Sequence, residues 1–145
     1  MPSPAADAVL SAQLRMSVMR LSRRLRGERA DASLELTLTQ LAALATVHVS
    51  GPLTLRQLAD AERVQPPSMT KVVSVLEQRG LVDRAAHPTD GRQVLLSVSP
   101  AGKALLHEDR RRRDVWLFQR LRTLTPDEVA ILRQAAPILE RLART

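Results

Sequence analysis

The 145-residue sequence contains no cysteine and no tyrosine, and Trp116 and Phe118 are its only tryptophan and phenylalanine. Without cysteine, the chain can form neither disulfides nor thiolate zinc sites, and it cannot sense oxidation through a thiol. Modules that bind single-stranded nucleic acid need aromatic rings on which the bases stack. The scarcity of aromatic residues therefore argues against that class of protein.

The sequence also lacks the usual signatures of a catalytic or metal site. It has no glycine-rich phosphate loop, nucleophile elbow, zinc-ligand spacing or carboxylate pair, and its five glycines fall at expected helix ends or turns. The three histidines, His48, His87 and His107, are far apart in sequence, as surface or core histidines usually are. We therefore predict a protein that is not an enzyme, with no catalytic residues, no cofactor and no metal.

Apolar runs long enough to span a bilayer are absent, and so is the N-terminal pattern of a secretory signal. The expectation is a soluble, cytoplasmic protein without a membrane partner. Hydrophobic residues make up 44% of the chain, which is enough for one ordinary domain or for a protomer that completes its core against a partner.

Basic side chains outnumber acidic ones, nearly all of them are arginine, and the formal net charge is +7. Such a charge attracts a polyanion. By itself it does not distinguish nucleic acid from an anionic membrane surface, so the choice depends on the motifs.

Both ends of the chain predict long helices with unpaired apolar faces. From Leu10 to Leu25, apolar residues recur every three or four positions, which predicts a helix over 4–27 that Ser3 caps. A polar link over 28–33 follows. Ser99 opens a second long helix, and a third begins near residue 126 with another continuous apolar face.

The stretch HEDRRRRD, residues 107–114, is polar on every side of any helix. A helical segment without an apolar face is not expected in a core. Its four successive arginines step around the helix axis and cannot form one DNA-facing patch. We interpret the stretch as a solvent-exposed connector with local ion pairs.

Three further helices are predicted in the centre of the chain. Thr37 with Gln40 and Thr54 with Gln57 have the spacing of capping boxes, in which the threonine oxygen accepts a backbone N–H and the glutamine side chain answers. Pro66 suits the first turn of a third helix. That helix has a buried face at Met69, Val72, Val73 and Leu76. Its opposite face has no acid and carries Pro67, Thr70, Lys71, Ser74 and Gln78.

The segment VDRAAHPTDGRQVLLSV, residues 82–98, predicts a β-hairpin. Asp90-Gly91 is the strongest turn signal and separates two apolar, strand-like runs. The loop is longer than a tight hairpin needs, which places Arg92 near a protruding tip.

The order of helix, short helix, tight turn, presented helix and hairpin is that of a winged helix-turn-helix. We predict a mainly α fold with a small β-hairpin wing (α+β), together with a helical lobe. A helix fits the major groove of double-stranded DNA, and an arginine at a protruding tip can enter the narrow, electronegative minor groove. Arg92 is the strongest single candidate for a functional residue.

Other interpretations of the same pattern stay open at this point. The turn at Asp90 to Arg92 can be a plain turn with a solvated arginine. A sequence-indifferent architectural DNA-binding protein would use the fold electrostatically, and competition with random duplex would reveal it. A winged helix used for protein contact would show no duplex affinity and a flat salt response.

The sequence resembles the MarR family of bacterial transcription regulators over nearly its whole length. The motifs that carry the resemblance are Leu58-Ala59, the helix end LEQRGLV at 76–82, the wing turn Asp90-Gly91-Arg92, and the exit SPAG at 99–102. The resemblance implies one protomer over 1–145, with a winged DNA-binding lobe at 37–99. A helical dimerisation lobe would comprise 4–27 and 100–145.

The implied function is a homodimeric, sequence-specific regulator of transcription, usually a repressor, on a pseudo-palindromic operator in double-stranded DNA. The presented helix of each protomer would lie in the major groove, with Arg92 in the minor groove. In the family, the aspartate that matches Asp90 steadies the wing through ion pairs.

The presented helix departs from the family pattern at its start, where Gln65 and the Pro66-Pro67 pair replace a serine or threonine cap and a small polar residue. Gln65 is a poor cap, and a proline ring can offer bases only apolar contact. Major-groove contacts are expected from Pro67 and mainly from Ser68, Thr70 and Lys71. Expected phosphate contacts, which position the protein without reading sequence, are Arg56, Gln57 and Arg84.

Many relatives in the family respond to small phenolic or aromatic acids bound between the lobes. Segments suited to such an effector pocket carry Arg15, Met19, His48 and Trp116. The alternative interpretation is that Met19 and Trp116 are simply core residues.

Overall fold

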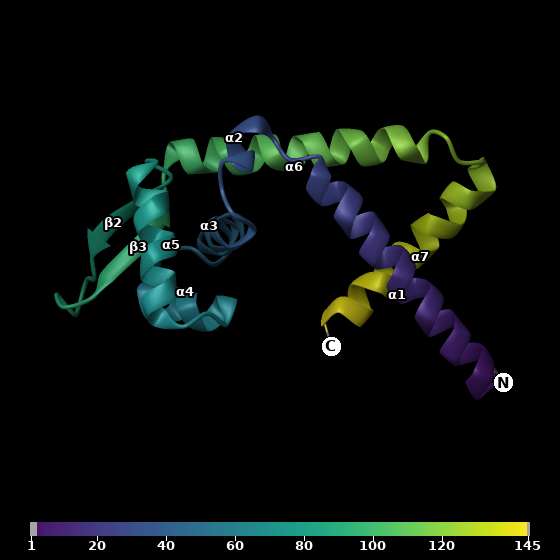
Figure 1. Ribbon diagram of the computed structural model, residues 1–145, viewed down its shortest axis with the longest axis horizontal. Coiled ribbons are helices and arrows are strands. Elements are labelled where there is room, and N and C mark those ends of the chain that lie inside the picture. Colours follow the sequence, from purple (N-terminus) through teal and green to yellow (C-terminus); the bar gives the residue numbers. More distant parts are fainter. Residues whose placement is uncertain (1–2, 145) are drawn as a thin grey trace. The chain divides into compact units, whose positions relative to one another are not determined.

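The computed structural model describes residues 3–144 and is mostly helical, with one small antiparallel sheet (Figure 1). The predicted fold class is confirmed. The elements are α1 (Pro4–Gly27), α2 (Asp31–Leu34), α3 (Leu38–Ser50), β1 (Leu53–Thr54), α4 (Leu55–Glu62), α5 (Pro66–Gln78), β2 (Val82–Ala86), β3 (Val94–Val98), α6 (Pro100–Leu121) and α7 (Pro126–Arg144).

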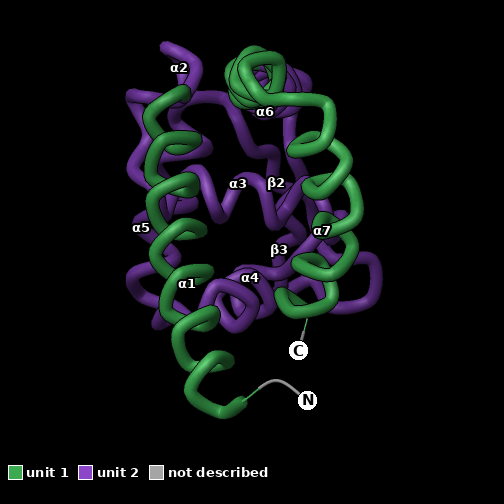
Figure 2. The backbone as a smooth tube through the Cα atoms, turned by 90° about the vertical axis from the view of Figure 1, so that its right-hand side faces the viewer, with its two compact units in different colours: residues 1–28, 112–145 green, residues 29–111 purple. Residues whose placement is uncertain are grey.

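The chain divides into two compact units (Figure 2). One comprises residues 29–111 and holds α2 to β3 with the first half of α6; we call it the winged unit. The other comprises residues 1–28 and 112–145 and holds α1, α7 and the rest of α6; we call it the helical unit. The winged unit therefore extends beyond the 37–99 lobe expected from the sequence at both ends.

The winged unit has a hydrophobic core of its own. Helices α3, α4 and α5 pack against one another, and their inward side chains, together with one from β3, are fully buried: Leu44, Val47, Leu58, Met69, Val73, Leu76 and Leu96. The buried positions of α5 have the spacing that the sequence predicted for its apolar face. The two predicted capping boxes, at Thr37 and Thr54, are both formed.

The sheet has the strand order β1-β3-β2 and is antiparallel throughout. The hairpin register pairs Val82 with Val98 and Ala86 with Val94, which leaves residues 87–93 as its loop. The third strand, β1, was not predicted. It is two residues long and pairs Leu53 with Leu96, so it is too short to show the alternation by which strands are recognised.

The start of α6 is tied to the end of α5. The Ser99 hydroxyl accepts a hydrogen bond from Gly102 N at 3.1 Å and donates one to Gly80 O at 2.5 Å. A Cβ on Gly102 would overlap the Leu81 carbonyl oxygen and lie 2.7 Å from Val98 Cγ1. Glycine is needed here because helix and hairpin approach so closely.

Two expectations about polar segments are wrong at particular residues. The link at 28–33 has two buried residues, Ala30 and Ser33, and the one-turn helix α2 begins within it at Asp31. The stretch interpreted as a solvated connector is exposed at most positions and has a local ion pair between Arg111 and Glu108, but Asp109 within it is fully buried. Its Oδ1 accepts hydrogen bonds from Ser33 Oγ at 2.6 Å and from Ala30 N at 3.1 Å. These donors, distant in sequence, satisfy Oδ1 and lower the cost of burying the carboxylate.

The helical unit differs in kind, because neither α1 nor α7 contains a buried residue. Most of their apolar positions are exposed in the single chain, including Val9 (59%), Ile131 (65%) and Leu142 (64%). Figure 2 shows α1 and α7 on opposite sides of the helical unit. None of the helices in residues 3–144 combines the length and apolarity needed to cross a membrane.

Candidate nucleic-acid interface

Helix α5 is presented by a tight turn after α4. Arg63 adopts the left-handed conformation (φ 53°, ψ 42°) and is the only non-glycine residue among 3–144 with a positive φ. Val64 N then donates to Ala59 O at 3.0 Å, which closes the end of α4. Gln65 precedes α5 without a side-chain capping bond, as its residue type predicted.

The first two turns of α5 leave few hydrogen-bond donors on an exposed surface. Pro66 and Pro67 have no N–H, so Ser68 supplies the first free one, while Met69 N already donates to Gln65 O at 3.0 Å. The hydroxyl of Thr70 donates to Pro66 O at 2.9 Å and is thus turned back onto the helix. The exposed side chains are those of Pro66, Pro67, Ser68, Thr70 and Lys71.

The hairpin β2–β3 forms a wing whose tip projects beyond the helices of the winged unit (Figure 1). Arg92 lies in its loop and is exposed. Asp90 Oδ1 accepts from Arg92 N at 3.0 Å, and Asp90 Oδ2 accepts from Gln93 Nε2 at 3.2 Å. Asp90 therefore supports the turn through hydrogen bonds to neutral groups, where the resemblance implied ion pairs.

A second support of the wing was missed by sequence reasoning. The ring nitrogen Nδ1 of His87 accepts hydrogen bonds from Thr89 N at 3.2 Å and from Asp90 N at 3.1 Å. His87 N also donates to Gln93 O at 3.2 Å, across the base of the loop. An isolated histidine gives no signal of this role, because the role depends on how the loop folds.

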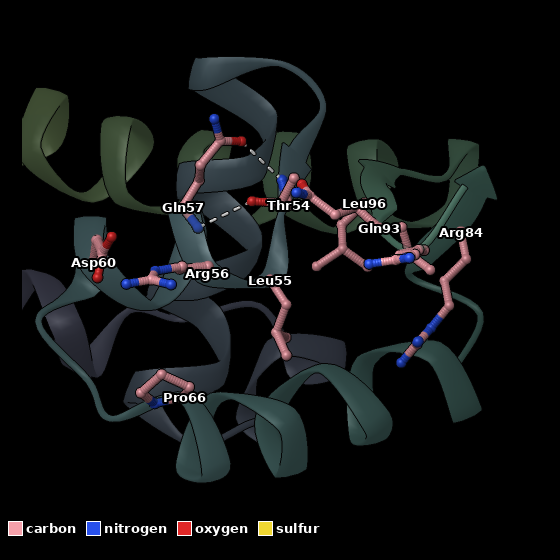
Figure 3. A pocket seen from close by; sticks show the side chains of 11 residues that line it. Thr54, Leu55, Arg56, Gln57, Asp60, Pro66, Arg84, Gln93 and Leu96 are labelled. Carbon is pink, nitrogen blue, oxygen red and sulfur yellow. Dashed lines mark hydrogen bonds between the residues drawn. The ribbon is translucent and has the colours of Figure 1, made fainter. Parts of the chain in front are cut away.

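A cleft of about 760 Å³ lies between α4, the start of α5 and the wing (Figure 3). It brings together three of the predicted DNA contacts from different elements, Arg56 of α4, Arg84 of β2 and Arg92 of the wing, and a fourth, Gln57, also lines it. Asp60 is the only acidic residue in the lining. A positively charged, open cleft of this kind suits a phosphate backbone.

Two of the residues in the cleft already have partners. Gln57 Oε1 accepts from Thr54 N at 2.9 Å in the capping box, as the dashed lines in Figure 3 show. Arg84 Nε forms an ion pair with Glu77 of α5. This pair offsets the one acidic charge within α5, so its surface stays free of uncompensated negative charge.

The four residues expected near an effector do not all belong to one unit. Arg15, Met19 and Trp116 are part of the helical unit, whereas His48 is part of the winged unit. Met19 is 52% exposed and Trp116 is partly exposed, so neither is a core residue of the single chain. The guanidinium of Arg120 lies 5.4 Å from the Trp116 ring centroid, within the range of a cation–π contact.

Comparison with known proteins bears on this site. The profile of the MarR family matches residues 36–94. An uncharacterised HTH-type transcriptional regulator of Mycobacterium bovis is 49% identical over 134 residues, 92% of each chain. The multiple antibiotic resistance protein MarR of Salmonella typhimurium is 32% identical over 100 residues, 68% of this chain and 69% of that protein. The crystal structure of a proposed transcriptional regulator from Pseudomonas aeruginosa aligns with a TM-score of 0.84, at 32% identity and 99% coverage of both chains.

These likenesses agree with the winged helix-turn-helix and its basic cleft. The chain belongs to the MarR family. It is a DNA-binding regulator of transcription and not an enzyme, as the sequence predicted.

Proposed function

We propose that this regulator is a homodimeric repressor that binds a pseudo-palindromic operator in the cytoplasm and is released by a small aromatic or phenolic effector. The cleft is the observation that supports this mode of DNA binding. It is lined by Arg92 of the wing and by Arg56 of α4, together with Pro66 at the start of α5. A duplex lying there would receive α5 in its major groove and the wing in the adjoining minor groove.

Within this arrangement, different exposed side chains of α5 make different kinds of contact with the bases. Lys71 and Ser68 supply donors, while Pro67 and the methyl group of Thr70 supply apolar contact suited to thymine. Arg92 enters the minor groove and Asp90 supports its loop. Phosphate contacts come from Arg56, Gln57 and Arg84.

Dimerisation is supported by the exposed apolar faces of the helical unit. Helices α1 and α7 expose large hydrophobic side chains along their length and bury none. A helix with such a face is stable in water when another surface covers it. A second copy of the chain would cover both helices and would also set two α5 helices at a fixed spacing. The dimerisation lobe would then correspond to residues 4–27 and 100–145.

The effector site is proposed near Arg15, Met19, His48 and Trp116. Arginine would pair with a carboxylate, and the exposed methionine and tryptophan surfaces would contact an aromatic ring. Thermal unfolding with and without salicylate, a simple phenolic acid, tests this part. A rise in Tm that the Arg15→Ala variant loses is expected.

The test of DNA binding starts from duplexes that the full-length protein enriches from a random-sequence library. Arg92→Ala should lower the affinity for an enriched duplex by about 1–3 kcal/mol at moderate salt, and Lys71→Ala should also alter base preference. The matched control is Arg79→Ala, which removes the same charge from an arginine that is paired with Glu35. Enrichment of no sequence, or equal losses in the Arg92 and Arg79 variants, would contradict the proposal.

A further inference from the structure

One imidazole ring holds the first half of the wing loop. His87 Nδ1 accepts two backbone N–H groups, those of Thr89 and Asp90, at 3.2 and 3.1 Å, and the hydroxyl of Thr89 lies 3.3 Å from the same nitrogen. Together with the bond from His87 N to Gln93 O, these contacts fix residues 87–90 as a compact turn.

These contacts require the Nδ1 atom of the ring to act as an acceptor. A histidine nitrogen that accepts hydrogen bonds carries no proton, so the neutral ring holds its proton on Nε2. When the ring is protonated, both nitrogens become donors. Nδ1–H would then face two N–H groups, and both hydrogen bonds would be lost.

The turn leads directly to the residue proposed to enter the minor groove. His87 holds the N–H of Asp90, and the carboxylate of Asp90 holds Arg92 N at 3.0 Å and Gln93 Nε2 at 3.2 Å. We propose that His87 is a positioning residue: its neutral ring shapes the loop that presents Arg92, so protonation of His87 weakens DNA binding. This inference rests on the proposed function.

The charged groups around the loop do not supply a substitute for the lost acceptor. The loop itself carries Asp90 and Arg92, and β3 has no ionisable side chain. Strand β2 carries Asp83 and Arg84, and the arginine is paired with Glu77 of α5. Asp90 and the phosphates of DNA attract an imidazolium, but that attraction leaves the two N–H groups without an acceptor.

The chain offers a sharp pair of variants for the test. In His87→Asn, the side-chain oxygen can accept N–H groups from residues further along the turn, as asparagine commonly does, but it does not titrate. In His87→Ala the acceptor is removed at every pH. His107→Asn serves as a control, because this exposed histidine of α6 lies outside the wing.

Affinity for a duplex enriched by the wild-type protein is measured for full-length proteins at about pH 8 and about pH 5.5, on either side of the range in which histidines change charge. At the higher pH, His87→Asn should bind like wild type, and His87→Ala should bind about fivefold more weakly, the effect of one net hydrogen bond. On acidification, wild type and His107→Asn should lose affinity relative to His87→Asn. Equal acid responses in wild type and His87→Asn would overturn the proposal, as would wild-type affinity in His87→Ala.

A measurement without DNA separates this inference from the proposed function. The ¹⁵N shifts of the His87 ring should report a proton on Nε2 at neutral pH, and the amides of Thr89 and Asp90 should exchange faster with solvent in His87→Ala. A ring protonated on Nδ1, or unchanged exchange, would refute the positioning role. If the library yields no sequence, the proposed function fails while these shifts still test His87; if Arg92→Ala weakens binding and His87→Ala does not, the positioning role alone fails.

Discussion

The winged unit and the helical unit use similar helices in opposite ways. In the winged unit, α3, α4 and α5 turn their apolar faces onto one another, and Leu44, Leu58 and Leu76 are completely buried. In the helical unit, α1 and α7 have equally regular apolar faces, yet no residue of either helix is buried. The winged unit therefore completes its core within the chain. The helical unit needs another surface to cover the apolar faces of α1 and α7.

Local helix signals do not account for this difference. Thr125 and Glu128 form a capping box at the N-terminus of α7, each side chain accepting the backbone N–H of the other residue. Thr37 and Gln40 form the same arrangement at the start of α3. Capping fixes where a helix begins and satisfies its first N–H groups, but the partner of the apolar face comes from tertiary or quaternary contacts. The units therefore differ in what covers the helices.

The largest expected effect is in the core of the winged unit. Leu58→Ala should lower the free energy of unfolding by about 2–5 kcal/mol, because it leaves a cavity where no solvent reaches. Urea unfolding of the full chain measures it. The control Val49→Ala, at a position that is 79% exposed, should change the stability by less than about 0.5 kcal/mol. A small loss at Leu58 would contradict the view of the winged unit as self-sufficient.

The next effect concerns the helical unit and its proposed partner copy. Leu10→Asp should weaken association by about 1.5–3 kcal/mol or more, because a side chain that is 53% exposed in the single chain would be buried in the dimer. Sedimentation equilibrium over a range of concentrations measures it. Ala12→Asp adds the same charge on the opposite side of α1 and should associate almost like wild type. A wild-type protein that stays monomeric at tens of micromolar would contradict the proposal that a second copy covers the helical unit.

Two glycines, Gly102 in the winged unit and Gly27 in the helical unit, differ in the space around them. Substituting each by alanine compares a tightly packed position with an open one. Gly102→Ala should cost about 1–3 kcal/mol, because the new methyl group meets a backbone carbonyl that cannot move aside easily. Gly27→Ala, at the end of α1, meets nothing within 4 Å and should stabilise the helix by up to about 1 kcal/mol. Thermal unfolding should show a lower Tm for Gly102→Ala and a higher Tm for Gly27→Ala. Equal shifts in Tm would argue against the close contact of α6 with Leu81.

The smallest effect distinguishes the apolar surface that meets DNA from those that meet protein. Replacing thymine by deoxyuridine, one position at a time in an enriched duplex, should reveal a position in each half-site that loses about 0.8 kcal/mol, the value of one buried methyl group. Pro67→Ser should make that position insensitive. If no thymine methyl matters, the first two turns of α5 read DNA through Ser68 and Lys71 alone.

Much of the winged unit could be predicted because its signals are local. The capping boxes at Thr37 and Thr54, the proline that opens α5, and the Asp90-Gly91 turn each act within a few residues of chain, so their spacing identified the elements. The predicted DNA contacts that line the cleft come from α4, β2 and the wing loop. The winged helix-turn-helix order of these elements explains why they lie together.

The misses share a different cause. Asp109 is buried where Ser33 and Ala30, more than seventy residues away, donate hydrogen bonds to its Oδ1. Strand β1 exists because β3 offers it an edge, and His87 is an acceptor because its loop turns two N–H groups toward one ring nitrogen. No periodicity or motif in the sequence encodes these partners.

The boundaries of the longer helices, the hairpin, the basic charge and the class of the protein could all be inferred from the sequence, because each follows from composition or from interactions between near neighbours. Only the tertiary structure decided which apolar faces are covered, which polar groups are buried and which atoms shape the wing. Those outcomes depend on side chains that meet across long stretches of chain, and such meetings are fixed by the three-dimensional arrangement of the whole winged unit.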